Sequence, residues 1–320
     1  MTAALQDAAG VRLLGEQAVA RHLPPAAAIA CVREAFALLR DGAIENPVRL
    51  RQQVGPAGTN TMWAAAPSRG ALGVKLYPIV RDDVTRGSAF TFLLHTLPEG
   101  RLRAVLAADL LGRRRTGAAS AVAAELLAKP GSRTLALIGA GGQARHQAEA
   151  LAQVLELERV LIASRGTARR DALAAELDAV LDADVRATEA EEAVRGADVV
   201  VTITGAQEPV LRGEWLAPGT LVIAAGSNAA AKRELDRAAV ERCDRIVVDD
   251  LAVARLECGD LLANGIGFES VEAMPVLLAE GAPARDPQHV VLFESHGLAA
   301  QDLLCALHVV EAVEREERSA

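Results

Sequence analysis

The sequence predicts an α/β protein in which a Rossmann-type domain with a doubly wound parallel sheet accompanies a separate α+β domain. After Pro130, short apolar runs alternate with helical patterns, which is typical of a parallel sheet. Before Pro130, consecutive strand-like runs are joined by tight turns, which indicates an antiparallel or mixed sheet. The length of 320 residues also favours two domains. We therefore expect residues 1–128 plus 299–320 to form the α+β domain and residues 129–298 the Rossmann domain.

The α+β domain is expected to begin with a helix. Pro24 and Pro25 open a helical pattern of apolar residues that stops at Gly42. A long alanine-rich helix is expected over residues 111–128. The strands expected between these helices cover residues 49–54, 60–66, 73–77, 90–96 and 102–107.

The Rossmann domain is expected to alternate strands with helices. Its two best-marked helices are expected over residues 142–157 and 167–181. Residues 290–293 are expected to close the sheet, and a final helix over residues 298–313 to return to the first domain. The other strands are expected over residues 134–138, 159–163, 198–203, 220–225 and 245–248.

Composition argues against several classes of function. The net charge of −8 and an aromatic content of 2% make a nucleic-acid partner a poor fit. No membrane span is expected, because apolar runs are strand-length or are broken by charges, and residues 1–7 lack the pattern of a secretory leader. Four scattered cysteines fit free thiols in a reducing cytoplasm, and without CxxC or HExxH spacing we expect no metal site.

A glycine-rich turn follows the apolar run 134–138 and opens a helix, in the pattern GxGxxA. Such a turn lets the backbone approach a pyrophosphate at a helix N-terminus, which carries free N–H groups and partial positive charge. The alternative is a turn that binds nothing, but strand, turn, helix and next strand all lie where the motif needs them. The residues that we assign to the dinucleotide are Gly139, Gly141, Gly142, Gln143 and Ala144.

The end of the next strand indicates which dinucleotide binds. NAD sites usually place a carboxylate there for the ribose 2′-hydroxyl, whereas this chain has Ser164 and Arg165. A hydroxyl beside a guanidinium suits a 2′-phosphate. NADP(H) is therefore favoured, with NAD(H) as the alternative. A further alternative is that Arg165 binds no cofactor and is only a solvent-exposed residue at the start of a helix.

Taken together, the motifs resemble the ornithine cyclodeaminase/mu-crystallin family over about residues 47–302. The resemblance implies a substrate domain that also forms a homodimer and a site for a small amino or imino acid in the cleft between the domains. The matching elements are Pro47-Val48-Arg49, Met62, Gly73-Val74-Lys75, Arg115-Thr116-Gly117-Ala118, residues 139–144, Gly226-Ser227-Asn228, Arg233-Glu234-Leu235-Asp236 and Phe293-Glu294-Ser295-His296-Gly297.

The resemblance also assigns roles to single residues. It implies that Arg49, Lys75 and Arg115 hold the substrate carboxylate, which two guanidiniums and an ammonium can do. A buried lysine among cations should have a lowered pKa and so could move a proton at the substrate nitrogen; the alternative is a surface lysine on an edge strand. The remaining expected site residues are Met62 at the substrate, Thr116, Thr202, Thr204 and Ser227 at the cofactor, and Asn228 as a catalytic group. The alternative for the threonines is that they occur at these positions only because threonine favours β-strands.

Two departures point away from the family's title reaction. Ornithine cyclodeaminases carry an aspartate where this chain has Asn228 and a glutamate where it has Asn60. An amide can neither act as a base nor pair with a cationic amine as a carboxylate does. The first interpretation is therefore an NAD(P)-dependent dehydrogenase or reductase of an amino or imino acid. The alternatives are an ornithine cyclodeaminase and a non-catalytic NADP-binding protein.

Overall fold

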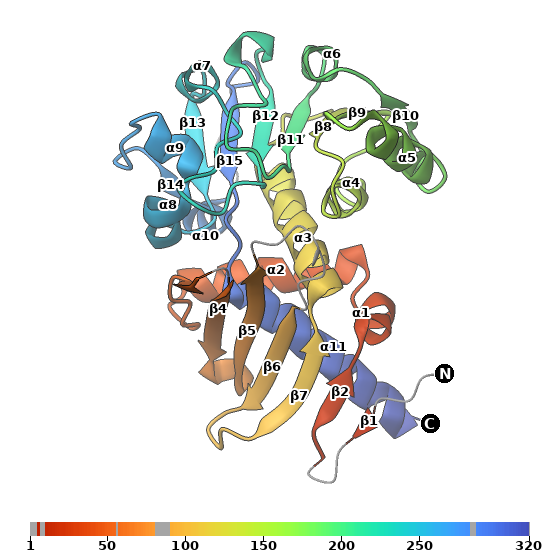
Figure 1. Ribbon diagram of the computed structural model, residues 1–320, viewed down its shortest axis with the longest axis vertical. Coiled ribbons are helices and arrows are strands. Elements are labelled where there is room, and N and C mark those ends of the chain that lie inside the picture. The colour runs from red at the N-terminus through yellow and green to blue at the C-terminus, as the bar shows by residue number, and fades with distance from the viewer. Residues whose placement is uncertain (1–4, 7–9, 56, 81–89, 282–285, 320) are drawn as a thin grey trace. The chain divides into compact units, whose positions relative to one another are not determined.

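The computed structural model describes residues 5–6, 10–55, 57–80, 90–281 and 286–319 (Figure 1). These residues divide into two compact units, the first of residues 1–115 and 298–320 and the second of residues 116–297. The predicted boundary follows residue 128, whereas the observed division falls inside helix α3 (Asp109–Leu127). Most of residues 1–7, on which the expected absence of a leader rests, lie outside the described residues.

The first unit is built on a mixed sheet, as the turn-rich sequence predicts. In the described part of the chain its strand order is β1-β2-β7-β6-β5-β4-β3, with β2 and β7 parallel and the other neighbours antiparallel. Its strands are β1 (Leu5–Gln6), β2 (Arg12–Leu14), β3 (Leu50–Val54), β4 (Ala57–Ala66), β5 (Ala71–Val80), β6 (Thr91–Thr96) and β7 (Leu102–Ala107). Its helices, besides the start of α3, are α1 (Glu16–His22), α2 (Pro25–Arg40), the 3₁₀ turn η1 (Pro67–Arg69) and α11 (Ala299–Ser319).

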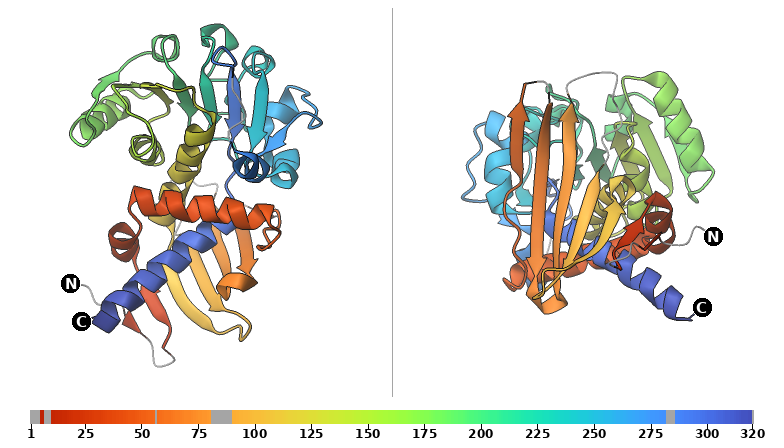
Figure 2. Two further views of the ribbon diagram at one scale, coloured as in Figure 1. Left: turned by 180° about the vertical axis from the view of Figure 1, so that it is seen from behind. Right: turned by 60° about the horizontal axis from the view of Figure 1, so that its bottom comes forward.

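Helix α11 organises this unit. It contacts β4, β5 and β6 of the sheet and packs against α2 (Figure 2). Helix α2 begins at Pro25, where the fixed φ of proline favours a first turn, and buries Ala28, Val32 and Phe36 at four-residue spacing. The return of the C-terminal helix to the first unit agrees with the prediction, although the helix runs to Ser319 rather than to residue 313.

The second unit carries a parallel sheet. Over the described residues its order is β10-β9-β8-β11-β12-β15-β13-β14, and every neighbouring pair is parallel. Its strands are β8 (Thr134–Ile138), β9 (Arg159–Ala163), β10 (Asp184–Ala187), β11 (Val199–Thr202), β12 (Leu221–Ala224), β13 (Arg245–Val248), β14 (Glu272–Ala273) and β15 (Val291–Glu294). Its helices are α4 (Ala144–Leu151), α5 (Thr167–Asp178), α6 (Ala190–Val194), the 3₁₀ turn η2 (Gly213–Trp215), α7 (Arg237–Glu241), α8 (Leu251–Glu257), α9 (Gly259–Ala263) and α10 (Met274–Glu280).

The order from β10 to β15 is the Rossmann order, in which the chain reverses direction across the sheet between β8 and β11. One prediction about this sheet is wrong. Strand β15 does not close the sheet but lies between β12 and β13, with β14 at the edge. All four of its residues are buried, because an interior strand of a parallel sheet is covered on both faces.

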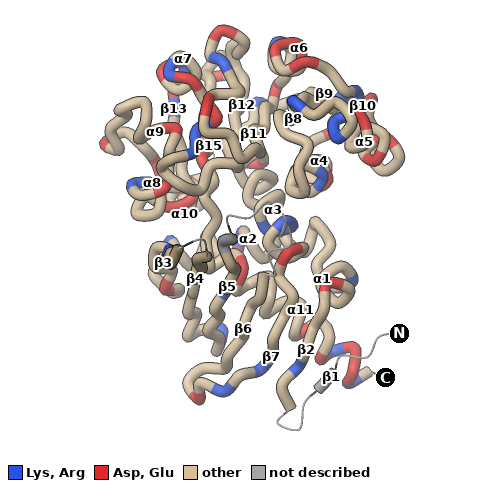
Figure 3. The backbone as a smooth tube through the Cα atoms, viewed as in Figure 1, with Lys and Arg blue, Asp and Glu red and all other residues tan. Residues whose placement is uncertain are grey.

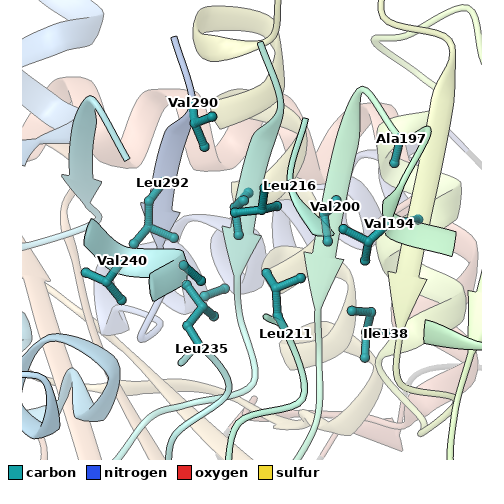
Figure 4. Packing of buried hydrophobic residues seen from close by; sticks show 14 of the residues in the cluster. Ile138, Val194, Ala197, Val200, Leu211, Leu216, Leu235, Val240, Val290 and Leu292 are labelled. Atoms are coloured by element: carbon teal, nitrogen blue, oxygen red, sulfur yellow. The ribbon is translucent and has the colours of Figure 1, made fainter. Parts of the chain in front are cut away.

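Helix α4 is also shorter than predicted, since it ends at Leu151 rather than near residue 157. Beyond it the backbone N–H groups of Gln153 and Val154 bond three residues back, which ends the α-helical pattern. The apolar core beside the sheet joins residues of several strands and loops, as Figure 4 shows for Val200, Leu211 and Leu216.

Charged residues of both signs are mixed along the chain (Figure 3). Near the end of α11, Arg12 and Arg103 form ion pairs with Glu314. Among the described helices, none alone is long and apolar enough to cross a membrane, and α1 and α2 meet that test only when taken together across an 87° bend.

Candidate active site

The glycine-rich turn after β8 has the backbone that the sequence predicts. Gly139 has φ +123°, and a Cβ placed there would lie 2.6 Å from the carbonyl oxygen of Ile203 in the loop after β11. A Cβ at Gly141 would meet nothing within 4 Å, so this glycine leaves open space where a pyrophosphate would approach. Ala144 begins α4 and is fully buried, as the small third position of the motif requires.

A cavity of about 920 Å³ opens at this turn, at the carboxyl ends of the strands where the sheet order reverses. This is the place where open α/β sheets bind nucleotides. It is lined by Ile138, Gly139, Ala140, Gly141, Ala163, Ser164, Arg165, Gly166, Thr167, Ala168, Arg169, Glu189, Ala190, Ile203, Thr204, Gly205, Ala206, Pro209 and Val210. The residues present therefore fit a dinucleotide.

The cavity brings together five of the predicted cofactor residues, namely Gly139, Gly141, Ser164, Arg165 and Thr204. The others are not among its lining residues. Gly142, Gln143 and Ala144 belong to the turn that enters α4, while Thr116, Thr202 and Ser227 are buried elsewhere in the second unit.

The cavity also contains a carboxylate that the sequence reasoning did not include. Glu189 follows β10, and its Oε1 accepts a hydrogen bond of 2.8 Å from Nη1 of Arg170. Within the described residues, Arg165 and Arg169 form no ion pair, so no described carboxylate neutralises these two guanidiniums of the lining. Only the tertiary structure could reveal Glu189, because it lies 26 residues after the end of β9.

Glu234 organises the loops at the carboxyl ends of β11 and β12. One carboxylate oxygen accepts hydrogen bonds from the backbone N–H and the hydroxyl of Thr204, both at 2.7 Å. The other accepts from the hydroxyl of Thr202 at 3.0 Å and from the N–H of Gly226 at 2.8 Å. Both predicted threonines thus donate to a buried carboxylate. Glu234 stands in a matched motif, but the sequence reasoning assigned it no role.

Burial raises the pKa of Glu234 to about 7, although the hydrogen bonds from Thr204 act in the opposite direction. The neighbouring carboxylate of Asp260 raises the pKa further. Two further predicted residues follow Gly226. The Ser227 hydroxyl donates to the carbonyl oxygen of Lys232, and the Oδ1 of Asn228 accepts from Nζ of the same lysine at 3.1 Å.

In the first unit, the predicted substrate residues share one region of the sheet. Met62 on β4 is the cross-strand partner of Lys75 on β5, and both side chains are buried. Arg49 lies just before β3 and donates from Nη1 to the hydroxyl of Tyr77, two residues beyond Lys75. Lys75 is therefore not a surface lysine on an edge strand, because β5 lies between β4 and β6.

Lys75 and Arg115 converge on one acceptor, Asp302 of α11. The Oδ1 of Asp302 lies 2.9 Å from Nζ of Lys75 and 3.1 Å from Nε of Arg115. Gly112 of α3 makes room for the ammonium, since a Cβ at that position would lie 2.9 Å from Nζ. The sequence reasoning missed both Asp302 and Gly112, because their partners lie on distant segments of the chain.

Burial and neighbouring charges both act on the pKa values of Lys75 and Asp302. Burial lowers the pKa of Lys75, as predicted, and Arg115 and Arg49 lower it further while Asp302 acts against them. For Asp302, burial alone would raise the pKa, but the charges of Arg115 and Lys75 hold it below the ordinary value. The cluster thus combines a carboxylate, two guanidiniums and an amine whose proton is held less tightly than in water.

These features define an α/β protein with a Rossmann unit and a second unit that carries a buried cationic cluster. A profile of the ornithine cyclodeaminase/mu-crystallin family matches residues 12–317. The chain belongs to this family.

Three relatives place it more closely. It is 31% identical over 289 residues to ketimine reductase mu-crystallin of Mus musculus, covering 85% of this chain and 86% of the relative. It is 31% identical over 308 residues to iminosuccinate reductase of Paracoccus denitrificans, covering 93% and 95%. The structure of Thermococcus litoralis Delta(1)-pyrroline-2-carboxylate reductase in complex with NADH and L-proline superposes with a TM-score of 0.91 at 26% identity, covering 95% of this chain and 98% of that one.

Proposed function

We propose that the protein is an NAD(P)-dependent oxidoreductase that interconverts a small imino acid and the corresponding amino acid. The observation that carries the proposal is the buried group of Arg49, Lys75 and Arg115, in which Asp302 pairs with Lys75 and Arg115; it suits an α-carboxylate next to a basic nitrogen. An oxidoreductase of this kind also needs a binding site for its nicotinamide cofactor, and the cavity of the second unit fits a dinucleotide. Three relatives named as reductases of ketimines, iminosuccinate and pyrroline-2-carboxylate support the same class of substrate.

Each residue of the cluster has a distinct task in this proposal. The guanidiniums of Arg49 and Arg115 bind the substrate carboxylate and so fix the position of the α-carbon. Asp302 holds Lys75 and Arg115 in place through one oxygen. A nicotinamide cofactor, when held in the cavity of the second unit, would supply the hydride exchanged with the α-carbon.

Lys75 is the group that we assign to the proton at nitrogen. In the direction of reduction, the C=N bond becomes a single bond, and the substrate nitrogen gains one proton. An ammonium whose pKa is lowered by burial and by neighbouring cations can release that proton and take one up in the reverse direction.

We further propose that NADP(H) is preferred over NAD(H). Ser164, Arg165 and Arg169 line the cavity after β9, where a 2′-phosphate would lie, and Glu189, which also lines the cavity, is paired with Arg170. The solved relative named above was obtained with NADH, and fluorescence titration with NADPH and NADH tests which of the two this protein prefers. A homodimer and a cytoplasmic location stay predictions, and light scattering of the purified protein tests the first.

The residues at two positions favour a reductase over an ornithine cyclodeaminase. Asn60 is buried, and its Oδ1 lies 3.4 Å from Nη1 of Arg51, so a cation and not a carboxylate stands beside it. Asn228 likewise receives a hydrogen bond from the cationic Lys232. A diamine substrate needs negative charge near its distal ammonium, and these two positions offer none.

The experiment follows cofactor oxidation and product formation in parallel. NADPH and NADH are offered with Delta(1)-pyrroline-2-carboxylate, iminosuccinate, or pyruvate plus ammonia, and L-ornithine is offered with catalytic NAD(P)⁺. We expect cofactor oxidation with at least one imino acid and no proline from ornithine. Proline formation without net cofactor change would make the protein a cyclodeaminase, and cofactor binding without any turnover would make it a binding protein. Asn228→Asp is the matched variant, which should gain cyclodeaminase activity only if position 228 limits it.

A further inference from the structure

A second group of chemically active side chains lies buried in the second unit and includes none of the residues assigned to the cofactor or the substrate. Cys258 precedes α9, Glu294 ends β15 and His296 follows it. The ligand atoms of these three side chains all lie within 4.8 Å of one another. We refer to these residues as the Cys258 cluster. Nε2 of His296 lies 4.0 Å from Oε2 of Glu294, and both side chains are fully buried.

Glu294 is a buried carboxylate, and neither of its oxygens accepts a hydrogen bond from an N–H or O–H group of the described residues. Its surroundings are themselves acidic, since the carboxylates of Asp260, Glu234 and Asp249 all act on it electrostatically. The thiol of Cys258 lies against it. Burying a carboxylate that lacks compensation is costly, so this site calls for a cation or a proton.

His296 is oriented as metal-binding histidines are. Its Nδ1 lies 3.3 Å from Oδ1 of Asp249, while Oδ2 of the same aspartate accepts hydrogen bonds from the backbone N–H groups of His296 and Gly297. A carboxylate on Nδ1 sets the tautomer in which Nε2 carries a lone pair. That nitrogen is the one on the side of Glu294.

We propose that Cys258, Glu294 and His296 bind a divalent transition metal, with Zn²⁺ as the best match to a sulfur, a nitrogen and an oxygen ligand. Zinc holds such ligands at about 2.0–2.3 Å in a tetrahedron, which sets them roughly 3.3–3.8 Å apart. The observed separations are up to about 1 Å longer, a difference that side-chain adjustment covers.

The metal ties together segments that the sequence separates widely. Cys258 joins α8 to α9, whereas Glu294 and His296 belong to the end of β15. Because all three side chains are buried, the ion would enter as this unit folds and would stabilise the native state. The proposed ion has no assigned part in the proposed reaction, so either proposal can fail without the other.

The test measures metal content and thiolate coordination in the full-length protein. After expression in medium supplemented with zinc and gel filtration without chelator, mass spectrometry of the metal should find about one zinc ion per chain. Protein refolded with Co²⁺ should show a thiolate-to-cobalt charge-transfer band. Cys258→Ser should lose that band and most of the zinc, whereas Cys243→Ser, which alters a thiol of the same unit outside the cluster, should keep both.

Two outcomes would overturn the proposal. One is full metal content in a folded Cys258→Ser protein. The other is wild-type protein that takes up neither zinc nor cobalt, together with an infrared carbonyl band of a protonated carboxylic acid that disappears in Glu294→Gln. If Cys258→Ser does not fold, as judged by circular dichroism, Glu294→Gln serves as the second variant for metal content. Its retention of full zinc content would equally contradict the assignment.

Discussion

Two buried carboxylates, one in each unit, have opposite electrostatic surroundings. Asp302 in the first unit lies against the cations of Lys75 and Arg115, and their charges hold its pKa below the ordinary value in spite of burial. Glu234 in the second unit accepts its hydrogen bonds from neutral hydroxyl and backbone groups and has Asp260 as a charged neighbour. Burial therefore dominates, and its pKa rises to about 7.

The difference shows that burial does not by itself decide the charge of a side chain. Asp302 stays ionised because formal positive charges compensate its lost hydration, so it can fix Lys75 and Arg115 at any physiological pH. Glu234 has only dipoles for compensation and titrates near neutrality. We therefore expect Asp302 to keep its charge across the physiological pH range and Glu234 to change its charge near neutral pH.

The largest expected effect concerns the amine of the first unit. Lys75→Ala should lower turnover about 10²–10⁴-fold, the usual contribution of general acid–base catalysis, and leave cofactor affinity nearly unchanged. Steady-state rates and fluorescence titration of the cofactor measure the two quantities. Lys129→Ala, which removes a lysine paired with Asp198 in the other unit, is the matched control and should keep its activity. Near-native turnover in Lys75→Arg would show that the lysine acts only by its charge.

Removing the carboxylate of the first unit should cost stability. Asp302→Ala leaves Lys75 and Arg115 buried without their shared partner, which typically lowers the free energy of unfolding by about 3–5 kcal/mol. Urea denaturation measures the loss. Asp109→Ala, which breaks a partly exposed ion pair with Arg113, should cost at most about 1 kcal/mol. Equal losses of unfolding free energy in the two variants would contradict the view that Asp302 compensates the buried charges of Lys75 and Arg115.

The carboxylate of the second unit should make stability depend on pH. The pKa of Glu234 is about 7 in the folded chain against an ordinary 4.5, so the folded state binds its proton more tightly than the unfolded state does. The contribution of this proton is complete below about pH 4.5 and is lost as the pH rises to about 7, which lowers the free energy of unfolding by up to about 3 kcal/mol. The difference between wild type and Glu234→Gln in urea denaturation at pH 5 and pH 8 isolates this effect.

The control for that measurement is Glu241→Gln, which alters an exposed carboxylate of α7 and should not change the pH dependence. Above pH 7, Glu234→Gln should also weaken cofactor binding. The NH₂ group of the new amide would face either the donors of Thr204 or those of Thr202 and Gly226. Because NH₂ is itself a donor, it cannot accept their hydrogen bonds, and the loops they hold beside the cavity would shift. If Glu234→Gln keeps the same pH dependence as the wild type, the shifted pKa belongs to another group.

The smallest expected effect concerns cofactor choice. Arg165→Ala should weaken NADPH binding by about 1–3 kcal/mol, as for one charge-assisted hydrogen bond, and leave NADH binding unchanged. Fluorescence titration with both cofactors measures it. Arg195→Ala, at an exposed arginine paired with Glu191 outside the cavity, is the control. An NADH preference that survives Arg165→Ala would contradict the assignment.

Local patterns were sufficient to predict the fold class and the glycine turn. Strand β7 (Leu102–Ala107) and strand β8 (Thr134–Ile138) begin and end where the apolar runs do. A short apolar run between turn residues has few conformations other than a strand available to it. The place of β15 in the sheet was not predictable in this way. Which strands pair is decided by packing between segments that lie far apart in the chain.

The sequence by itself determined which residue types were available: a GxGxxA turn, the cations Arg49, Lys75 and Arg115, and an arginine where a carboxylate is common. Their chemistry follows from residue type and local spacing. Only the tertiary structure decided their partners. Asp302 meets Lys75 across 227 positions of sequence, Glu234 meets Thr202 across 32, and His296 meets Asp249 across 47. Charge state and orientation depend on such long-range contacts, because they are set by what surrounds a buried group after folding.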